Sequence, residues 1–496
     1  MELTINVSGA SLDDLSAESP VAVFVHGEPA AIPAWTKDLS EPLQDAIKAR
    51  CDAGDFVGRA NSTAMAVATD GTRAVLVGIG PRRRLDMEAL RRAYGTAVQT
   101  ARGRSFKSLV APVVPGNDVT AITENAVAAA MMGNYLYDEC ISERSGLTPQ
   151  IESFTLWEPD GKRRRRVTNA VDNGKVLGEA TCRVRDLTNA PANDLFPKSY
   201  ATKAGTFCRD AGVKLQVLGL SDLKKMKMGA VLAVGGGSNN EPQFLVMQYN
   251  GRKGRAKAVD VALVGKGVTF DSGGISIKPT ADMWEMRGDM MGSAVMISTI
   301  CAAAKLKLPV NLVAVTPLVE NMPSGTAYRP GDVVRTMSGL TVEIMSTDAE
   351  GRMILADGLH YVQRYEPKLI IDCATLTGAM AVALGDVYGG YFATDNKAAK
   401  RLEKASDVSG EKVWRMPLHP DYDEKFKSPV ADMRNGGGRY GGASIAARIL
   451  QRFVGDYPWM HIDIAGIDLL KSGNPYTPKG ASGFGARLLI EFLRQK

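Results

Sequence analysis

Charged residues in four short segments have the types and spacing needed to hold metal ions. The segments are GKGVTFDSGG at 265–274, ISIKP at 275–279, MRGDMMG at 286–292 and TDAEGR at 347–352. They supply four carboxylates and three cations, which are Lys266, Asp271, Lys278, Asp289, Asp348, Glu350 and Arg352. Taken singly, each segment has an ordinary explanation, because DSGG is typical of a turn and an aspartate often caps a helix. Only the joint pattern indicates chemistry.

Four carboxylates brought to one sheet edge would repel one another strongly unless cations lay between them. Two divalent ions balance four negative charges, and two-metal sites with ions about 3.5–4 Å apart can be bridged by carboxylates without any histidine. The composition agrees with such a site, since the chain has four histidines, no HExxH and no CxxC pair. We therefore expect mostly oxygen ligands.

The three cations have different expected roles. A neutral lysine amine can ligate a metal, and the pKa of a buried Lys266 should fall beside two divalent cations. Carboxylates with one amine accept zinc but also manganese, magnesium or cobalt, so we expect metal exchange. Lys278 can stabilise the oxyanion formed when a metal-bound hydroxide attacks a carbonyl. Arg352 opens a predicted helix, where a small oxyanion acting as the general base would be favoured.

Alternating strands and helices are expected to position these residues. Apolar runs predict buried strands, and helical spacing predicts amphipathic or buried helices. The predicted strands are 260–267, 310–319, 340–346, 369–376 and 459–466, and the helices are 290–306, 351–365 and 484–495. This alternation predicts a mostly parallel or mixed sheet with helices on both faces, and functional groups gather at the carboxyl ends of such strands.

The N-terminal part reads as a smaller α/β unit. Short apolar runs at 21–27, 73–80 and 107–114 predict strands, and 85–102 has the spacing of a helix. The polar stretch 158–174 follows, and it is the best candidate for a boundary.

The predicted fold class is therefore α/β, with two domains. We expect a small N-terminal α/β domain at 1–165, a linker helix at 166–185 and a larger catalytic domain at 186–496. The larger domain should contain a mixed, mostly parallel sheet flanked by helices.

Composition excludes several protein classes. The 496 residues are 45% apolar and 23% charged, which is a globular balance rather than a disordered one. No run of eighteen apolar residues occurs, and the N-terminus lacks the pattern of a secretory signal, so we expect no membrane span or export. The six scattered cysteines suit reduced thiols in a cytosol-like compartment, so we expect a cytoplasmic protein.

Basic clusters at 82–84 and 162–166 raise the alternative of a nucleic-acid partner. No aromatic residues interleave with these arginines, so a stacking platform is missing and a solvated loop and linker are the favoured interpretation. The net charge of +6 is mild and demands no such partner.

Three other patterns have ordinary structural explanations. The glycine-closed runs 75–80 and 232–240, taken as strands, do not complete a dinucleotide-binding GxGxxG. NGGGRYGG at 435–442 lacks the GK[ST] of a phosphate loop and is interpreted as a tight active-site loop. His360 and His461 are interpreted as satisfied core histidines.

With these residues in place, the sequence resembles the leucyl aminopeptidase (cytosol aminopeptidase) family of two-metal exopeptidases. The resemblance rests on the four segments above in their order. It continues through ENMPSGTAYRPGDVV, CATLTGAMAVALG, WRMPL, KSPVADMRNGGGRYGGASIAA, HIDIAG and KGASGFGARLL. It covers roughly residues 180–496, while the N-terminal part is compatible with the family's smaller domain but carries no specific motif.

The resemblance implies a ligand set for each metal. One tightly held ion would be bound by Lys266, Asp271, Asp289 and Glu350. A second, more exchangeable ion would be bound by Asp271, Glu350 and Asp348, the last with its carbonyl helping. Zinc is the implied metal, with manganese, cobalt or magnesium at the exchangeable site.

The resemblance also implies the reaction. A bridging hydroxide would release N-terminal residues, often leucine, from peptides with a free amine, in enzymes that assemble as homohexamers. Lys278 would stabilise the tetrahedral intermediate, and Arg352 would hold a bicarbonate that serves as base. The implied pocket for the first side chain consists of Met286, Thr375, Gly378 and Ala465.

Three positions depart from the family's pattern. The family usually has Asn at Ser346, a small residue at Met291 and Lys at Arg287. None is an implied metal ligand, so the departures concern leaving-side specificity and metal affinity rather than reaction type.

Overall fold

The computed structural model describes residues 3–27, 30–81, 86–252 and 258–495, and these form two compact units. The first unit comprises residues 1–182 and 471–479, and the second comprises 183–470 and 480–496. The chain passes from one to the other within α5 (Gly161–Asn189), a continuous helix that contains the predicted linker range 166–185. The basic run 162–166, expected in a solvated linker, lies in the first turns of this helix.

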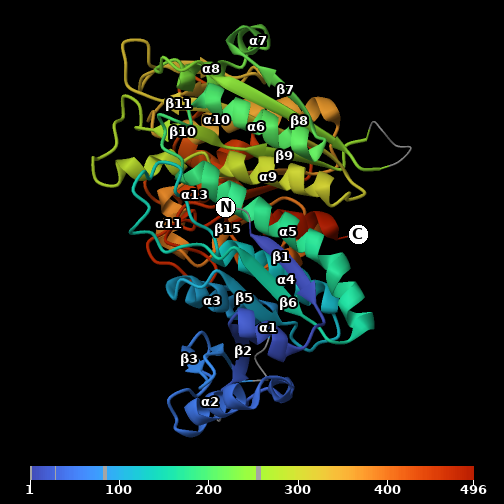
Figure 1. The fold of residues 1–496 in the computed structure, drawn as a ribbon. Coiled ribbons are helices and arrows are strands. Elements are labelled where there is room, and N and C mark those ends of the chain that lie inside the picture. The colour runs from blue at the N-terminus through green and yellow to red at the C-terminus, as the bar shows by residue number, and fades with distance from the viewer. Residues whose placement is uncertain (1–2, 28–29, 82–85, 253–257, 496) are drawn as a thin grey trace. The chain divides into compact units, whose positions relative to one another are not determined.

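The first unit contains a six-stranded sheet in the order β1-β6-β5-β2-β4-β3 (Figure 1). All neighbouring strands are parallel except β3 and β4. The strands are β1 (Thr4–Ser8), β2 (Val21–His26), β3 (Thr63–Val67), β4 (Arg73–Gly80), β5 (Ser108–Pro112) and β6 (Ser153–Trp157). The helices are α1 (Leu12–Glu18), η1 (Ala34–Asp38), α2 (Glu41–Asp52), α3 (Met87–Gly103) and α4 (Val119–Gly133).

Helices cover both faces of this sheet because successive residues of its central strands are apolar and point to opposite faces. Phe24 packs with residues of α3 and α4 in one core cluster, whereas its neighbours Val23 and Val25 pack with α1 and α2 in another. This alternation places α3 and α4 opposite α1 and α2.

The segment 471–479 belongs to the first unit although it lies near the end of the chain. The Tyr476 hydroxyl donates to the Glu88 carboxylate at 2.9 Å, and Gln99 Nε2 donates to the Asn474 carbonyl at 3.3 Å. Gly95 allows close approach on α3, because a Cβ there would lie 2.5 Å from the Pro475 carbonyl oxygen. The segment is therefore packed along α3.

The second unit is built on a nine-stranded mixed sheet, most of whose pairs are parallel. The path is β16-β15-β18-β14-β9-β11-β8-β7, and β10 also pairs with β11. The strands are β7 (Lys214–Leu218), β8 (Gln243–Asn250), β9 (Val261–Gly265), β10 (Gly267–Asp271), β11 (Asn311–Asn321), β14 (Ile370–Ala374), β15 (Gly389–Ala393), β16 (Val413–Arg415) and β18 (Trp459–Asp463).

Two small sheets accompany it. One contains β12 (Val333–Arg335), β13 (Thr341–Glu343) and β17 (Met433–Arg434), and the other contains β19 (Leu469–Leu470) and β20 (Gly480–Ala481). The predicted strand 340–346 is thus a short strand outside the main sheet.

Helices again lie on both faces of the main sheet. They are α6 (Pro197–Ala211), α7 (Leu220–Lys225), α8 (Gly229–Gly235), η3 (Met283–Gly288), α9 (Met291–Lys305), α10 (Glu350–Val362), η4 (Gln363–Tyr365), α11 (Gly378–Leu384), α12 (Asn396–Ser409), η5 (Pro420–Phe426), α13 (Gly442–Gln451) and α14 (Ala486–Arg494). In β9, Val264 packs beneath Gly358 of α10, whereas the next residue, Gly265, lies against Ser293 of α9. Successive strand residues point to opposite faces, so α10 and α9 cover opposite sides.

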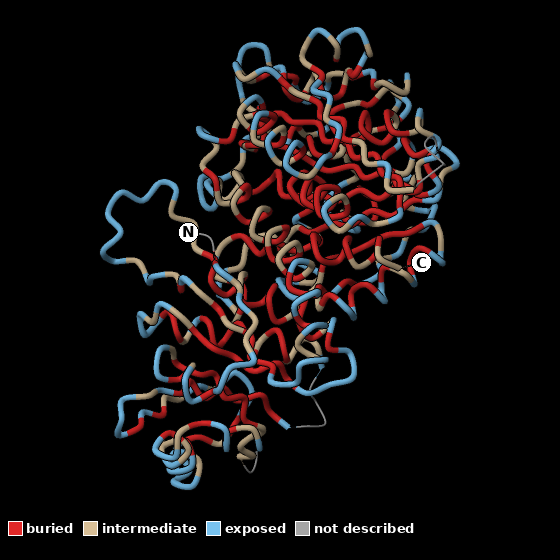
Figure 2. Tube along the Cα trace, turned by 45° about the vertical axis from the view of Figure 1, so that its right-hand side comes forward, coloured by how far each residue is buried: buried red, intermediate tan, exposed pale blue. Residues whose placement is uncertain are grey.

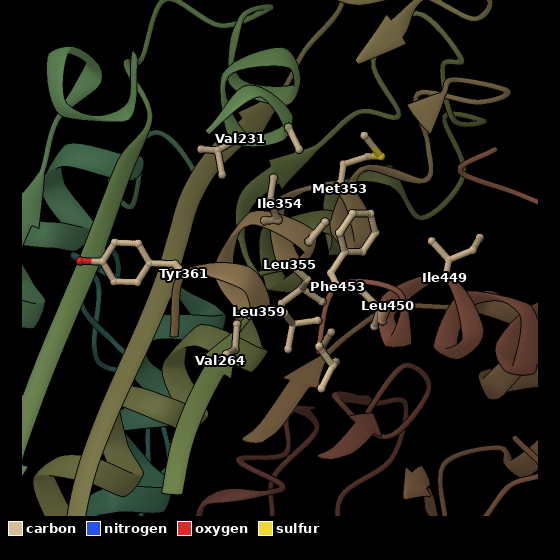
Figure 3. Close-up of a cluster of buried hydrophobic side chains, with 14 of the residues drawn as sticks. Val231, Val264, Met353, Ile354, Leu355, Leu359, Tyr361, Ile449, Leu450 and Phe453 are labelled. Carbon is tan, nitrogen blue, oxygen red and sulfur yellow. The ribbon is translucent and has the colours of Figure 1, made fainter. Parts of the chain in front are cut away.

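One core cluster of the second unit lies between α10, α8, α13 and the sheet (Figure 3). Ile354, Leu355 and Leu359 of α10 are fully buried there, with Val264 of β9 and Leu450 of α13. On the other face α9 is apolar on all sides and buried almost throughout, as expected for a central helix. Figure 2 shows the buried residues concentrated inside each unit.

The two-domain α/β fold with a mixed, mostly parallel sheet is confirmed. One segment was predicted wrongly: the run 232–240, taken as a strand, begins within helix α8. No helix of the described residues is long and apolar enough to cross a membrane.

Candidate active site

The site begins where neighbouring strands of the main sheet end. Lys266 follows β9, Asp271 ends β10, Asn321 ends β11 and Thr375 follows β14. Since β9 pairs in parallel with β11 and β14, and β10 with β11, these ends meet at one edge. Polar side chains that follow buried strands are brought together there, as the sequence predicted.

Lys266 is buried among oxygen atoms. Its Nζ lies 2.7 Å from Asp289 Oδ1 and 2.8 Å from Glu350 Oε1, and it donates to the Thr375 carbonyl at 2.7 Å. The Thr375 hydroxyl also donates to Asp289 Oδ1 at 2.8 Å. The lysine and threonine therefore fix one carboxylate oxygen of Asp289, while its Oδ2 is buried without a hydrogen-bond partner in the described structure.

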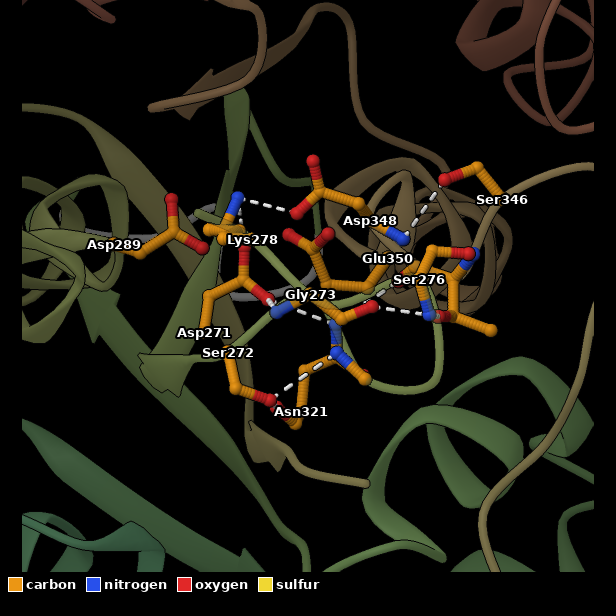
Figure 4. A network of polar contacts seen from close by, with 12 residues as sticks. Asp271, Ser272, Gly273, Ser276, Lys278, Asp289, Asn321, Ser346, Asp348 and Glu350 are labelled. Carbon is orange, nitrogen blue, oxygen red and sulfur yellow. Dashed lines mark hydrogen bonds and ion pairs between the residues drawn. The ribbon is translucent and has the colours of Figure 1, made fainter. Parts of the chain in front are cut away.

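Lys278 extends from the loop after β10 and joins two other carboxylates (Figure 4). Its Nζ lies 2.7 Å from Asp271 Oδ2 and also pairs with Asp348 Oδ1. The other oxygen of Asp271 accepts from Gly273 N at 2.9 Å and from Asn321 Nδ2 at 2.8 Å. Asp271 is thus held by three donors at the strand end.

Asp348 and Glu350 stand at the start of α10, where the helix dipole favours negative charge. Thr347 fixes this turn, because its hydroxyl donates to the Gly273 carbonyl at 2.6 Å and accepts from Ser276 N at 2.8 Å. The Ser346 hydroxyl accepts from Asp348 N at 3.2 Å. The turn is therefore tied to the loop after β10, and it reaches the site although β13 is not in the main sheet.

Two glycines permit the close approach of these segments. Gly273 has φ of 86°, and a Cβ there would lie 2.4 Å from the Ser276 carbonyl oxygen. At Gly351, a Cβ would lie 2.7 Å from Lys266 Cε and 2.8 Å from its Nζ. A larger residue at either position would displace a charged group of the site.

Burial and mutual charge shift the pKa values of the cluster. Burial lowers the pKa of Lys266, but the carboxylates of Asp289 and Glu350 outweigh it and hold that pKa above its usual value. Burial raises the pKa of Asp271 to about 6, and the Glu350 carboxylate adds to this. Burial also raises the pKa of Asp289 well above its usual value. For Glu350, the ammonium groups of Lys266 and Lys278 outweigh burial and lower the pKa.

The donor set fits divalent cations. Asp271, Asp348 and Glu350 offer carboxylate oxygens that all lie within 4.8 Å of one another. Two ammonium groups lie among the four carboxylates. This agrees with the expectation from the sequence that cations must offset the repulsion between these carboxylates. The unpartnered buried Oδ2 of Asp289 offers a further oxygen ligand.

Arg352 is half-buried at the first turn of α10, with its Nε atom buried. Its Nη1 donates to the Asn435 carbonyl at 2.8 Å, and its Nε has no partner among the described residues. Asn435 Oδ1 in turn accepts from Met345 N at 2.8 Å. The glycine-rich loop that begins at Asn435 therefore contacts the site, and the arginine keeps one donor free for an anion.

The four residues implied for a side-chain pocket occupy three segments. Met286 lies in η3, Thr375 and Gly378 flank the turn after β14, and Ala465 follows β18. A Cβ on Gly378 would meet nothing within 4 Å, so this position opens onto free space.

Asp463, which the sequence did not single out, joins two of these segments. This buried carboxylate ends β18 and accepts from Leu376 N at 3.0 Å, Ala465 N at 3.2 Å and the Thr377 hydroxyl at 2.7 Å. It therefore holds both sides of the prospective pocket in one place.

Asn321, Thr347 and Asn435 were also missed. The only signal for Asn321 was its position at the end of a buried strand beside Asp271, and the other two lie next to motifs without being charged. Their importance comes from contacts between loops, which sequence spacing does not reveal.

The histidines and the basic clusters differ in how far they are buried and paired. His461 is fully buried with its Nδ1 2.5 Å from Asp372 Oδ1, but its Nε2 has no partner among the described residues. His360 is only half-buried. In the run 162–166, Arg163 and Arg164 donate to backbone carbonyls, while the cluster 82–84 lies outside the described residues.

Comparisons with known proteins agree with the geometry. The catalytic domain of the cytosol aminopeptidase family matches residues 182–490, and the N-terminal domain of the same family matches residues 21–144. A probable cytosol aminopeptidase of Roseiflexus castenholzii is 40% identical over 97% of both chains, and one of Brucella melitensis is 41% identical over 90% of this chain and 92% of its own. Among solved structures, the bottromycin maturation enzyme BotP in complex with Mn is similar, with 33% identity, a TM-score of 0.84, and coverage of 96% of this chain and 99% of its own.

Proposed function

The chain belongs to the cytosol aminopeptidase family and is a metal-dependent aminopeptidase, and from this premise we propose that it uses two divalent ions to release N-terminal residues, leucine preferred within a broad range. The observation that carries the proposal is the cluster of four carboxylates and two lysines that gathers beside the ends of β9 and β10, with Lys266, Asp289 and Glu350 at its buried side.

Two ligand sets share the bridging carboxylates Asp271 and Glu350. Lys266 and Asp289 complete the first set, and Asp348 completes the second. The burial of Lys266 and Asp289, against the exposure of Asp348, supports a tightly held ion in the first set and an exchangeable one in the second. Zinc suits both sets, and manganese, cobalt or magnesium suits the exchangeable one.

When bound, two such ions supply Lewis acidity and a bridging hydroxide at neutral pH. The residues of the chain arrange the rest. Lys266 must give up its proton to act as a ligand. Its carboxylate partners Asp289 and Glu350 oppose this, and the charge of bound divalent ions would favour it. Thr375 keeps Asp289 oriented while this occurs.

Lys278 and Arg352 act on negative charge. The Lys278 ammonium, on a loop at the cluster's open side, stabilises the oxyanion that develops on the scissile carbonyl. Arg352 fits a bicarbonate that acts as the base, because its buried Nε donor has no partner among the described residues and lies at a helix N-terminus.

Exopeptidase action follows from the need for a free α-amine in the substrate. The free α-amine of a peptide's first residue is a metal ligand that an internal peptide bond lacks. The first side chain would enter the pocket of Met286, Thr375, Gly378 and Ala465, whose apolar members suit leucine. The peptide substrates are therefore those with an unblocked N-terminus.

We also propose that the enzyme acts in the cytoplasm as a homohexamer. The six cysteines are free thiols, which suits a reducing compartment, and the relatives carry the name cytosol aminopeptidase. Size-exclusion chromatography with light scattering measures the assembly, and a monomer would contradict this part.

The test of the reaction is hydrolysis of leucine p-nitroanilide after chelation and after zinc, manganese or cobalt is added back. N-acetyl-leucine p-nitroanilide is run in parallel. We expect activity to return with metal and to be lost on acetylation, since the acetyl group removes the amine. Equal hydrolysis of both substrates would contradict the exopeptidase mechanism.

The ligand assignment needs its own variants. Asp348→Ala should abolish activity with the fold intact and remove one of two metal ions per chain, measured by elemental analysis. Asp332→Ala is the matched control, because Asp332 is paired with Arg329 outside the cluster. Substantial residual activity with two ions bound to Asp348→Ala would rule out this residue as a ligand.

A further inference from the structure

The first unit contains a cavity of about 470 Å³ that the proposed chemistry does not use. It is lined by Phe24 and His26 from the end of β2, Trp35 from η1, Ile79 from β4, and Pro112 and Val114 at and after the end of β5. Its volume lies within the range of about 300–1,000 Å³ that is typical of small-molecule sites.

The cavity lies where the sheet topology changes direction. From β2 the chain proceeds through α2 and β3 to β4 on one side, and from β5 it proceeds through α4 to β6 on the other side. Because α2 and α4 cover opposite faces, their connections diverge between β2 and β5. In open α/β sheets this switch point, at the carboxyl ends of the strands, is where ligands bind.

The walls are mostly apolar, and two of their aromatic rings pack against further aromatic rings. Phe24 is buried and packs edge-on against Tyr94, with ring centroids 4.8 Å apart. Trp35 lies against Trp157, with centroids 5.8 Å apart. The described lining residues carry no carboxylate, ammonium or guanidinium group, so this part of the lining offers no counter-charge to an ionic ligand.

His26 supplies the one titratable side chain of the described lining. Its Nδ1 lies 3.2 Å from the Gly80 carbonyl oxygen, which can only accept, so the proton of the neutral ring is on Nδ1. Nε2 then carries a lone pair and accepts a hydrogen bond. A ligand that matches this cavity is uncharged, flat enough to contact the aromatic walls and able to donate one N–H.

We propose that this cavity binds a small, uncharged heteroaromatic molecule that packs against Phe24 and Trp35 and donates a ring N–H to Nε2 of His26. The site is independent of the aminopeptidase centre, because every lining residue belongs to the first unit and every proposed metal ligand belongs to the second.

Ligand-observed saturation-transfer NMR on the full-length protein tests the proposal with indole and 1-methylindole as probes. The two have nearly the same shape, but methylation removes the N–H. Indole should bind with a sub-millimolar Kd, and 1-methylindole about tenfold more weakly, as the loss of one hydrogen bond implies.

Two variants localise the binding. Ala34→Trp fills the cavity from an exposed lining position and should abolish indole binding, whereas Ala53→Trp, exposed at the end of α2, is the matched control and should not. His26→Phe should weaken indole to the affinity of 1-methylindole. All three should keep wild-type hydrolysis of leucine p-nitroanilide.

The proposal is overturned if neither probe binds at millimolar concentration, or if Ala34→Trp binds indole like wild type, which would place the probe elsewhere. Equal affinity for the two probes would refute the hydrogen bond to His26. None of these results depends on whether the metal-site assignment is correct.

Discussion

Replacement of Asp463 should alter substrate selection through the backbone it holds. Asp463→Ala leaves the amides of Leu376 and Ala465 without their acceptor and frees the Thr377 hydroxyl. A buried donor left unsatisfied costs about 1–3 kcal/mol. Both amides are partly buried, so the lower end applies to each and the free energy of unfolding should fall by about 2 kcal/mol. In Asp463→Asn one oxygen still serves both amides, so the cost is about 1 kcal/mol.

The kinetic effect follows from the same contacts. The Thr375–Gly378 turn and Ala465 lose their common anchor in Asp463→Ala, and misplacement of a positioned group by about 1 Å costs up to about 100-fold in rate. We expect kcat/KM for leucine p-nitroanilide to fall about 10- to 100-fold. The preference for leucine over alanine p-nitroanilide should shrink, because the pocket wall no longer has a fixed position.

Urea unfolding, elemental analysis and kinetics on both substrates separate the possibilities. Asp463→Asn should stay within about fivefold of wild type, as expected from one altered hydrogen bond. If Asp463→Ala reduces kcat/KM for both substrates by the same factor, Asp463 does not position the pocket. If Asp463→Asn is as damaging as Asp463→Ala, the charge matters and the anchoring argument is wrong.

Three further predictions concern other parts of the catalytic unit. Burial raises the pKa of Asp357 to about 7, above its unfolded value near 3.9, so ionisation of this carboxyl opposes folding. The free energy of unfolding of the wild type relative to Asp357→Asn, measured in urea with chelator, should therefore fall between about pH 4 and 7. A constant difference would contradict this. Gly351→Ala should lose at least about 100-fold in kcat and bind less metal, because its Cβ would displace Lys266. The control Gly103→Ala, whose Cβ would meet nothing within 4 Å, should have wild-type activity. An active Gly351→Ala would show that Lys266 tolerates displacement. Lys278→Ala should lower kcat more than it raises KM if the ammonium acts mainly in the transition state, and an effect on KM alone would instead indicate uniform binding.

The central strands of the main sheet, β9, β11, β14 and β18, were predictable because each is a continuous apolar run, whereas β7, β8, β15 and β16 were not predicted. The run ending at Gly265 and the run ending at Ala374 are buried on both faces, which leaves little choice of structure. The same reasoning failed at Gly229–Gly235, since a short apolar run can equally be a buried helix. The basic run at 162–166 was interpreted as a solvated linker from its charge alone. It is helical because it forms the first turns of α5, whose later turns contain apolar residues.

The charged members of the candidate site were predictable from their types, and the groups that hold them were not. Asp289 could be recognised as a carboxylate beside a helix, but the threonine that orients it comes from a strand end 86 residues later. Thr347 and Asn321 join loops that are adjacent only after folding. Uncharged residues that fix a site leave no composition signal, so a single sequence reveals the charged side chains of a candidate site better than the residues that support them.

The packing of segment 471–479 on α3 means that no single cut in the gene separates the two units. A fragment ending at residue 182 would expose the strip of α3 around Gly95, and a fragment beginning at residue 183 would carry a nine-residue arm without its docking surface. Truncation is therefore a poor way to assign functions to the two parts. Two separately expressed fragments should instead complement each other, because segment 471–479 of one fragment packs on α3 of the other.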